Sequence, residues 1–60
     1  FEKSIVVKRK IKKNQIIEFD DLTFKKPGYG ISPRKYKQIL GKRAKKNLKD
    51  DYILKIGDYY

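Results

Sequence analysis

The 60-residue sequence contains no cysteine, histidine, tryptophan or methionine. Without cysteine there is no disulfide framework, and without cysteine or histidine the usual zinc-ligand sets and nucleophilic triads are missing. Long apolar runs are also absent, since the N-terminal stretch FEKSIVVKRK has only three consecutive apolar residues, Ile5 to Val7. That run is too short for a signal peptide or a membrane span. Nothing in the sequence argues for secretion, and we expect a cytoplasmic chain with no metal or cofactor of its own.

Positive charge dominates the residues that are present. There are 17 lysines and arginines against 7 acidic residues, which gives a formal net charge of +10. Such a charge fits a nucleic acid or another phosphate-bearing partner. It also fits a lysine-rich surface with no particular partner, because the lysines are spread over the whole chain. Only Tyr29 is well placed for exposure as an aromatic, and no RNP-type, KH-type or zinc-knuckle signature is present. The sequence therefore argues against nucleic acid as a partner.

An internal repeat predicts the architecture. Residues 6–22 align without gaps on residues 43–59, and their apolar positions agree. Each copy reads as a short strand, an anchoring aliphatic residue, a polar turn, a second short strand and an acidic turn. The predicted strands are Ile5–Val7 and Ile16–Ile17 in the first copy, and Arg43–Lys45 and Ile53–Leu54 in the second. These short β-branched runs predict a mainly β fold in which the two copies pack with pseudo-twofold symmetry.

The unique segment between the copies, residues 23–42, predicts a third strand over Thr23–Lys25 and one short helix over 33–40. Ser32 has the chemistry of an N-cap, and Pro33 suits the first helical position. Gly41 stands where a left-handed residue commonly ends a helix. Tyr36 in the helix, and Tyr52 in the second copy, fall on predicted core positions.

The acidic pairs Asp20-Asp21 and Asp50-Asp51 admit a metal or acid–base interpretation. Asp21 and Asp58 occupy equivalent turns in the two copies, however, which favours capping of the backbone. Asp50-Asp51 aligns with a lysine and an asparagine, which favours a solvated turn. We find no complete catalytic constellation in the chain.

The stretch KKPGYGISP, residues 25–33, concentrates stiff and permissive backbone in one loop. A residue before proline prefers extended backbone, so Lys26 is predicted to continue the third strand. Gly28 and Gly30 are predicted to adopt turn geometry closed to other residues. With Pro27, Ser32 and Pro33 they would form a rigid loop that displays Lys26 and Tyr29. The alternative is a connector in which Lys26 is an ordinary surface lysine.

The stretches SIVVKRKIKKNQIIEFDDLTFKKPGYGISP and ILGKRAKKNL resemble the C-terminal antifreeze-like (SAF) domain of the sialic acid synthases, a family that includes legionaminic and pseudaminic acid synthases. The resemblance runs from Ser4 to Leu54. It implies a β-clip fold like that of type III antifreeze proteins, with residues 1–60 as one SAF domain excised from a larger synthase. The larger protein would carry an N-terminal TIM barrel that uses Mn²⁺ or Mg²⁺ to condense phosphoenolpyruvate with an N-acylated amino sugar.

The resemblance further implies that the SAF domain is not itself catalytic. It would reach across a swapped homodimer and cap the partner's barrel, where the arginine of the family's R-P-G contacts the acylamino sugar. Lys26 stands in place of that arginine, and lysine lacks the planar pair of donors. Lys26 and Tyr29 are the substrate-binding residues so implied. The chain is 40% charged, which argues against ice binding. A small basic nucleic-acid-binding module and a non-enzymatic SAF assembly chaperone are the alternatives.

Overall fold

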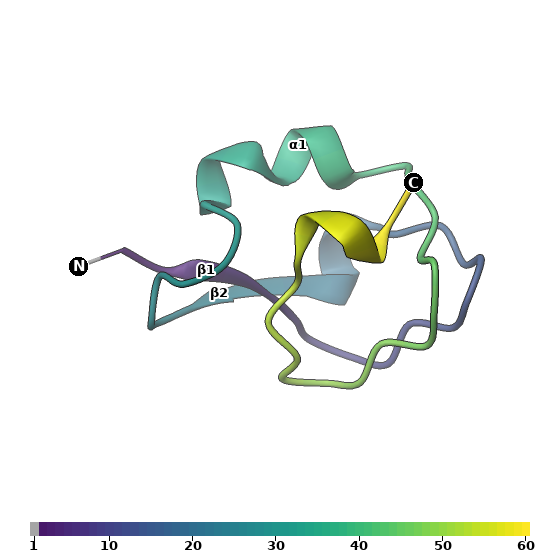
Figure 1. The fold of residues 1–60 in the computed structure, drawn as a ribbon, viewed down its shortest axis with the longest axis horizontal. Helices are drawn as coiled ribbons and strands as arrows, with labels where there is room; N and C mark the ends of the chain where they lie inside the picture. The colour runs from purple at the N-terminus through teal and green to yellow at the C-terminus, as the bar shows by residue number, and fades with distance from the viewer. Residues whose placement is uncertain (1) are drawn as a thin grey trace.

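The computed structural model describes residues 2–60, which form a small two-stranded sheet with a short helix across one side (Figure 1). Strand β1 (Ser4–Val7) pairs antiparallel with β2 (Leu22–Lys25), with Ser4 opposite Lys25 and Val7 opposite Leu22. The helix consists of a 3-10 turn, η2 (Pro33–Lys35), followed by α1 (Tyr36–Ile39). The predictions of strands at Ile5–Val7 and Thr23–Lys25, and of a helix near 33–40, are therefore confirmed.

The helix ends are built as the sequence indicates. The Ser32 hydroxyl accepts a hydrogen bond from the backbone N–H of Arg34 at 3.3 Å, and Pro33 occupies the first helical position. After Leu40 the chain leaves the helix through Gly41, whose φ of 88° is in the left-handed region that favours glycine. Both ends of this short helix are thus fixed by residues whose role is local.

Three of the predicted strands are wrong. The segments 43–45, 16–17 and 53–54 are extended, but each makes only isolated bridges, Val6 with Ile53, Ile16 with Arg43 and Ala44 with Tyr59. These segments therefore pair with their neighbours through isolated bridges and do not form strand ladders.

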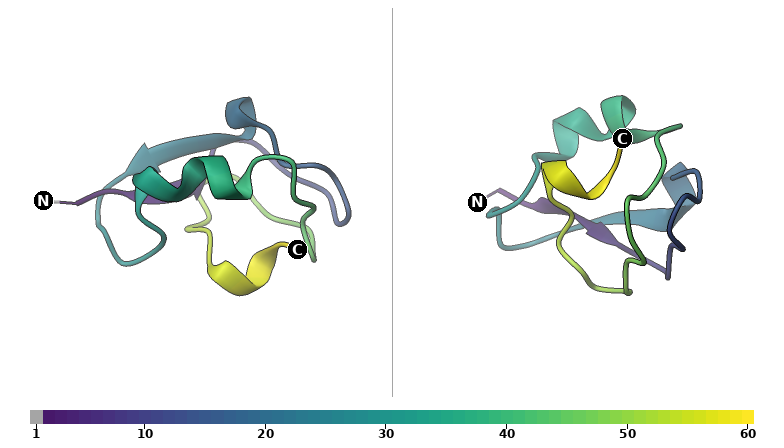
Figure 2. Two further views of the ribbon diagram at one scale, coloured as in Figure 1. Left: turned by 90° about the horizontal axis from the view of Figure 1, so that it is seen from above. Right: turned by 45° about the vertical axis from the view of Figure 1, so that its right-hand side comes forward.

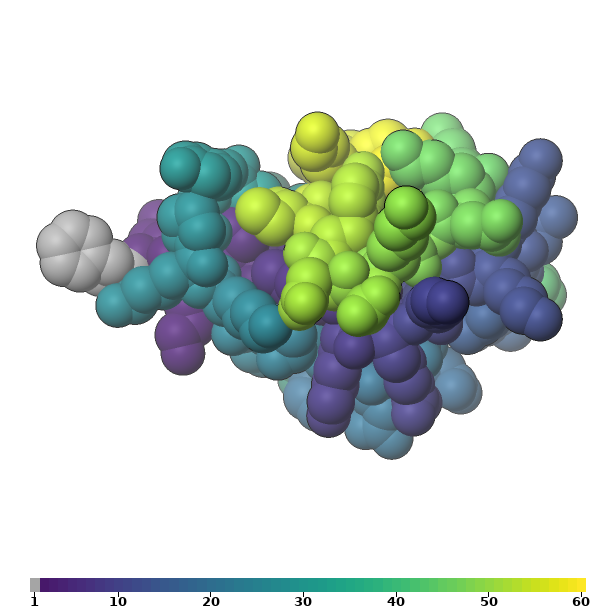
Figure 3. Space-filling model, turned by 90° about the horizontal axis from the view of Figure 1, so that it is seen from below, coloured from purple at the N-terminus to yellow at the C-terminus, as the bar shows by residue number. Residues whose placement is uncertain are grey.

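Backbone hydrogen bonds recur 37 residues apart along the chain. Asn14 donates to the Ala44 carbonyl at 2.7 Å, and Asp51 donates to the Val7 carbonyl at 2.7 Å. Asn14 and Asp51 also share a positive φ, 71° and 65°, which asparagine and aspartate tolerate better than most residues. The halves of the chain cross at Ile11 and Leu48, which exchange two backbone hydrogen bonds of 3.0 and 2.8 Å. Figure 3 looks onto the face where these segments, dark blue and green, lie against each other.

The hydrophobic core of residues 2–60 is built from the sheet, the helix and the C-terminal segment. Figure 2 shows how these segments are arranged in two views. Tyr36 and Tyr52, which we predicted in the core, are partly buried and pack against its edge. Because the chain is short, the core uses aliphatic residues from nearly every segment. Its buried members are Ile5, Val7, Ile11, Ile17, Leu22, Ile31, Ile39, Ala44, Leu48 and Leu54.

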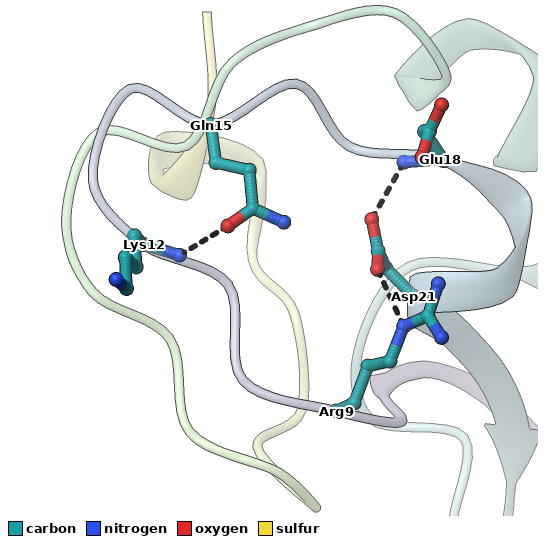
Figure 4. A network of polar contacts seen from close by, with 5 residues as sticks. All are labelled: Arg9, Lys12, Gln15, Glu18 and Asp21. Atoms are coloured by element: carbon teal, nitrogen blue, oxygen red, sulfur yellow. Dashed lines mark hydrogen bonds and ion pairs between the residues drawn. The ribbon is translucent and has the colours of Figure 1, made fainter.

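Two buried carboxylates cap the remaining 3-10 turns, η1 (Phe19–Asp21) and η3 (Ile56–Asp58). Asp21 accepts from the backbone N–H of Glu18 at 2.9 Å, and Asp58 accepts in the same way from Lys55 at 2.8 Å. This confirms the capping role predicted for both aspartates. Each also pairs with a cation, and Figure 4 shows the Arg9 side chain reaching Asp21 at 2.9 Å. Buried carboxylates with such partners are structural groups.

Two features of residues 2–60 bear on function. No set of three or more His, Cys, Asp or Glu side chains is grouped there as a metal ion would need. No helix in that part of the chain has the length and apolar character to cross a membrane.

Candidate functional site: the Pro27–Ile31 loop

The loop at 27–31 is fastened to the start of β1 by one side chain. Ser4 is fully buried, and its hydroxyl donates to the Pro27 carbonyl and accepts from the Gly30 backbone N–H at 2.9 Å. The Ile5 backbone N–H donates to the Ile31 carbonyl at 2.9 Å. The Ser4 hydroxyl therefore links two positions of the loop, Pro27 and Gly30, to the start of β1. The sequence analysis did not assign Ser4 any role, because a serine beside an apolar run has no distinctive local signature.

The glycines of the loop serve close packing, which corrects the prediction of special turn geometry. Gly41 is the glycine with positive φ within residues 2–60, so Gly28 and Gly30 do not need the left-handed region. A Cβ at Gly30 would lie 2.6 Å from Cγ2 of Ile53, and one at Gly28 would lie 2.8 Å from Cβ of Glu2. Both glycines are required because the loop lies directly against neighbouring segments.

The loop presents the predicted pair of side chains outward. Strand β2 ends at Lys25, so the prediction that Lys26 extends it is wrong; the chain turns at the Lys26–Pro27 bond, which is cis. Lys26 is exposed, and Tyr29 at the tip of the loop is 84% exposed. The structure thus places an ammonium group and a phenol on one tethered loop.

Two shallow grooves lie beside Tyr29, and both are lined by Tyr29, Gly30 and Lys55. The first, of about 350 Å³, is lined by Ile31 and Leu54, with Ile56 at its rim. The second, of about 630 Å³, is lined by Tyr52 and Ile53. Ile56 is 71% exposed, so together with Tyr29 it forms an exposed apolar surface. Ser32 lines the first groove, whereas Lys26, Pro27, Gly28 and Pro33 line neither. The sequence analysis missed the contribution of residues 52–56, which lie far from the loop in sequence.

Tyr52 in the second groove is held by the buried carboxylate below it. Its hydroxyl donates to Oδ2 of Asp58 at 2.7 Å, and Nζ of Lys46 lies 5.4 Å from its ring centroid. The hydrogen bond to Asp58 raises the pKa of Tyr52 above 10.0, and burial and the Asp58 charge raise it further. Lys46 opposes this shift because a nearby cation favours the phenolate.

Tyr52 is expected to ionise at higher pH than a free tyrosine. A pKa raised in the folded state contributes stability that is fully present below pH 10 and is lost as the pH rises through the folded-state pKa. Tyrosinate ultraviolet absorbance followed against pH should show a late phase that belongs to Tyr52. Tyr52→Phe should remove this late phase and flatten the alkaline loss of stability. A wild-type minus Tyr52→Phe difference curve with its midpoint at or below pH 10.0 would contradict the expectation.

Comparison with known proteins places this geometry in a family. The chain matches the SAF domain model over residues 2–58. It therefore belongs to the SAF-domain family. It is 45% identical over 53 residues to the N,N'-diacetyllegionaminic acid synthase of Campylobacter jejuni, covering 88% of this chain and 16% of that protein. It is 32% identical over 59 residues to the pseudaminic acid synthase of the same organism, covering 98% and 17%. The chain thus spans about one sixth of the length of these relatives.

Proposed function

We propose that this chain is the C-terminal, substrate-capping domain of a nonulosonic acid synthase of the sialic acid type. Such an enzyme condenses phosphoenolpyruvate with an N-acylated amino sugar. The observation that carries the proposal is the loop tethered by Ser4, which displays Lys26 and Tyr29 away from the core. The names of the two synthases to which the chain is similar support the same assignment.

In this proposal the loop acts by presenting contacts, and the reaction takes place elsewhere. Lys26 would donate a hydrogen bond to an acyl oxygen of the sugar, and Tyr29 would pack against the substrate beside it. The loop is held at Pro27 and at Gly30 before any ligand arrives, so little conformational entropy is lost on binding. The exposed apolar surface around Ile56 would meet the barrel domain of the partner subunit in a homodimer.

The metal of the reaction is assigned to that barrel domain, where Mn²⁺ or Mg²⁺ would bind. Both ions prefer oxygen ligands, mainly carboxylates. Among residues 2–60 the buried carboxylates, Asp21 and Asp58, are already bonded to backbone N–H groups and to cations. We therefore propose no metal-binding role for this domain. Separately, we propose a cytoplasmic location for the whole enzyme.

We further infer that the fold is a β-clip with pseudo-twofold symmetry. What supports this is the recurrence of backbone hydrogen bonds 37 residues apart, together with the crossing at Ile11 and Leu48. An axis through that crossing would relate the cap at Asp21 to the cap at Asp58. It would also relate their cationic partners, Arg9 and Lys46.

Lys26→Ala in the full-length enzyme is expected to lower kcat/KM for the acylamino sugar by about 10- to 150-fold. A charged donor to a neutral acceptor is worth about 1.5–3 kcal/mol, and each 1.4 kcal/mol is about tenfold. The melting temperature should barely change, because Lys26 is exposed. Lys26→Arg should retain most of the activity, because arginine carries the same positive charge and also has N–H donors, arranged in a planar fork.

The measurement is steady-state kinetics with the sugar varied and phosphoenolpyruvate saturating. Lys37→Ala is the matched control, because Lys37 is another exposed lysine, on α1 and outside the loop. Normal kinetics in a folded Lys26→Ala enzyme would refute the role of Lys26 in capping.

A further inference from the structure

The fold brings together two lysine-rich segments whose residues the proposed function does not use. Residues 8–13 and 45–49 are separate in sequence, but they cross at the Ile11–Leu48 pair. The backbone N–H of Lys13 also donates to Oδ1 of Asn47 at 2.8 Å. The two segments contain no carboxylate and have eight basic residues: Lys8, Arg9, Lys10, Lys12, Lys13, Lys45, Lys46 and Lys49.

A groove of about 370 Å³ runs along the crossing. Its floor is formed by Ile11 and Leu48, which are 1% and 2% exposed because their side chains enter the core. The residues on either side of each floor residue are exposed and line the groove; they are Lys10, Lys12, Asn47 and Lys49. We call the two floor residues and these four flanking residues together the basic groove. None of them lines the grooves beside Tyr29.

Within residues 2–60, no ion pair neutralises the lysines of the basic groove. The ion pairs recorded over residues 2–60 join Arg9 to Asp21, Lys46 to Asp58 and Lys25 to Asp51. Lys10, Lys12 and Lys49 take part in none of them. Asn47 uses one lone pair of its side-chain oxygen to accept from Lys13, and its amide nitrogen remains as a donor. The three lysine side chains that line the groove offer hydrogen-bond donors only.

We propose that the basic groove binds the phosphate backbone of a nucleic acid without sequence preference. Lysine binds phosphate as a point charge, without the bidentate geometry that arginine offers to both carboxylates and phosphates, which fits contact with a backbone and no selection of sequence. The one arginine of the two segments is engaged with Asp21. The groove contains no aromatic side chain on which a base could stack, so contact is confined to the backbone. Lysines within about a Debye length, ~8 Å, reinforce one another's attraction for such a chain.

This proposal is independent of the capping function and rests on tertiary structure. The lysines look dispersed in the sequence, and that dispersion argued against nucleic acid as a partner. The crossing at Ile11 and Leu48 is what concentrates them on one face. Figure 3 shows this face, with the dark-blue and green parts of the chain adjoining.

The test is binding of the 60-residue chain to a fluorescein-labelled oligo(dT) of about 12 nucleotides, a length within the ~4–16 nucleotides that small domains cover. Fluorescence anisotropy is measured between about 50 and 200 mM salt, the range over which phosphate contacts weaken most visibly. One variant combines Lys10→Gln, Lys12→Gln and Lys49→Gln. The matched control combines Lys3→Gln, Lys37→Gln and Lys42→Gln, three exposed lysines elsewhere, so both variants lose the same charge. Circular dichroism verifies that both fold.

The groove variant should bind on the order of 100-fold more weakly at low salt. The slope of log affinity against log salt should fall by about 2, since each phosphate contact on a single strand contributes about 0.7. The control variant should lose less than half as much. Equal losses in the two variants, or wild-type affinity that ignores salt, would overturn the proposal. The proposal would also be overturned if polyglutamate of the same charge displaced the labelled oligo(dT) as well as unlabelled oligo(dT) does, because the groove would then not distinguish phosphate from carboxylate.

Discussion

Replacing Ile17 by alanine should lower the free energy of unfolding by about 2–5 kcal/mol, the cost of a large-to-small change in a packed core. Ile17 is completely buried and belongs to the single hydrophobic core. A chain of this size is expected to have only about 3–9 kcal/mol of stability in total. The variant should therefore be largely unfolded at moderate temperature or low denaturant.

The neighbouring Ile16 provides a matched control for this prediction. It is the same residue type one position earlier, but its side chain is 44% exposed. Ile16→Ala should cost about 1 kcal/mol or less, because little transfer free energy and no cavity are involved. Urea denaturation followed by circular dichroism measures both variants. If Ile16→Ala and Ile17→Ala destabilised the protein equally, the burial of Ile17 and the exposure of Ile16 would both be contradicted.

Gly30→Ala is expected to destabilise the chain by about 1–3 kcal/mol, the range for overpacking a tight contact. The added Cβ would lie 2.6 Å from Cγ2 of Ile53 and 3.2 Å from the Leu54 carbonyl oxygen. Ile53 is β-branched and cannot easily rotate away, and the carbonyl belongs to the backbone. The loop would have to leave Ser4, so the Gly30 amide should also lose its protection from hydrogen exchange.

Gly57→Ala is the control for that substitution. A Cβ at Gly57 would meet no atom within 4 Å, and this glycine has no positive φ. Alanine there should be neutral, or should stabilise the protein by about 0.4–1 kcal/mol because it lowers the conformational entropy of the unfolded chain. Thermal denaturation of the two single variants compares them directly. A Gly30→Ala protein as stable as Gly57→Ala would mean that the loop is not packed against residues 53 and 54.

The two proposals assign different functions to different sets of residues in one small domain. The loop with Lys26 and Tyr29 offers a preorganised contact beside apolar grooves, which suits capping of a substrate site in a synthase. The lysines of the basic groove at the crossing offer donors and positive charge. Their residue sets do not overlap, so Lys26→Ala and the three groove substitutions can be measured separately.

Local chemistry was sufficient to predict several elements from the sequence. The helix near 33–40 follows from Ser32, Pro33 and Gly41, whose effects act within one turn of the chain. The caps at Asp21 and Asp58 follow from their equivalent turns, since a capping carboxylate bonds to an N–H three residues away. Strands β1 and β2 follow from short runs of β-branched and aromatic residues.

Only the tertiary structure decided the features that join distant residues. Ser4 reaches a loop more than twenty residues away, and Gly30 is required because Ile53 lies against it. The segments at 16–17, 43–45 and 53–54 form bridges in place of strands, because pairing depends on where each neighbour turns away. The basic groove exists because Ile11 meets Leu48. Composition fixes how much charge the chain carries, whereas contacts between residues far apart in sequence decide where that charge gathers.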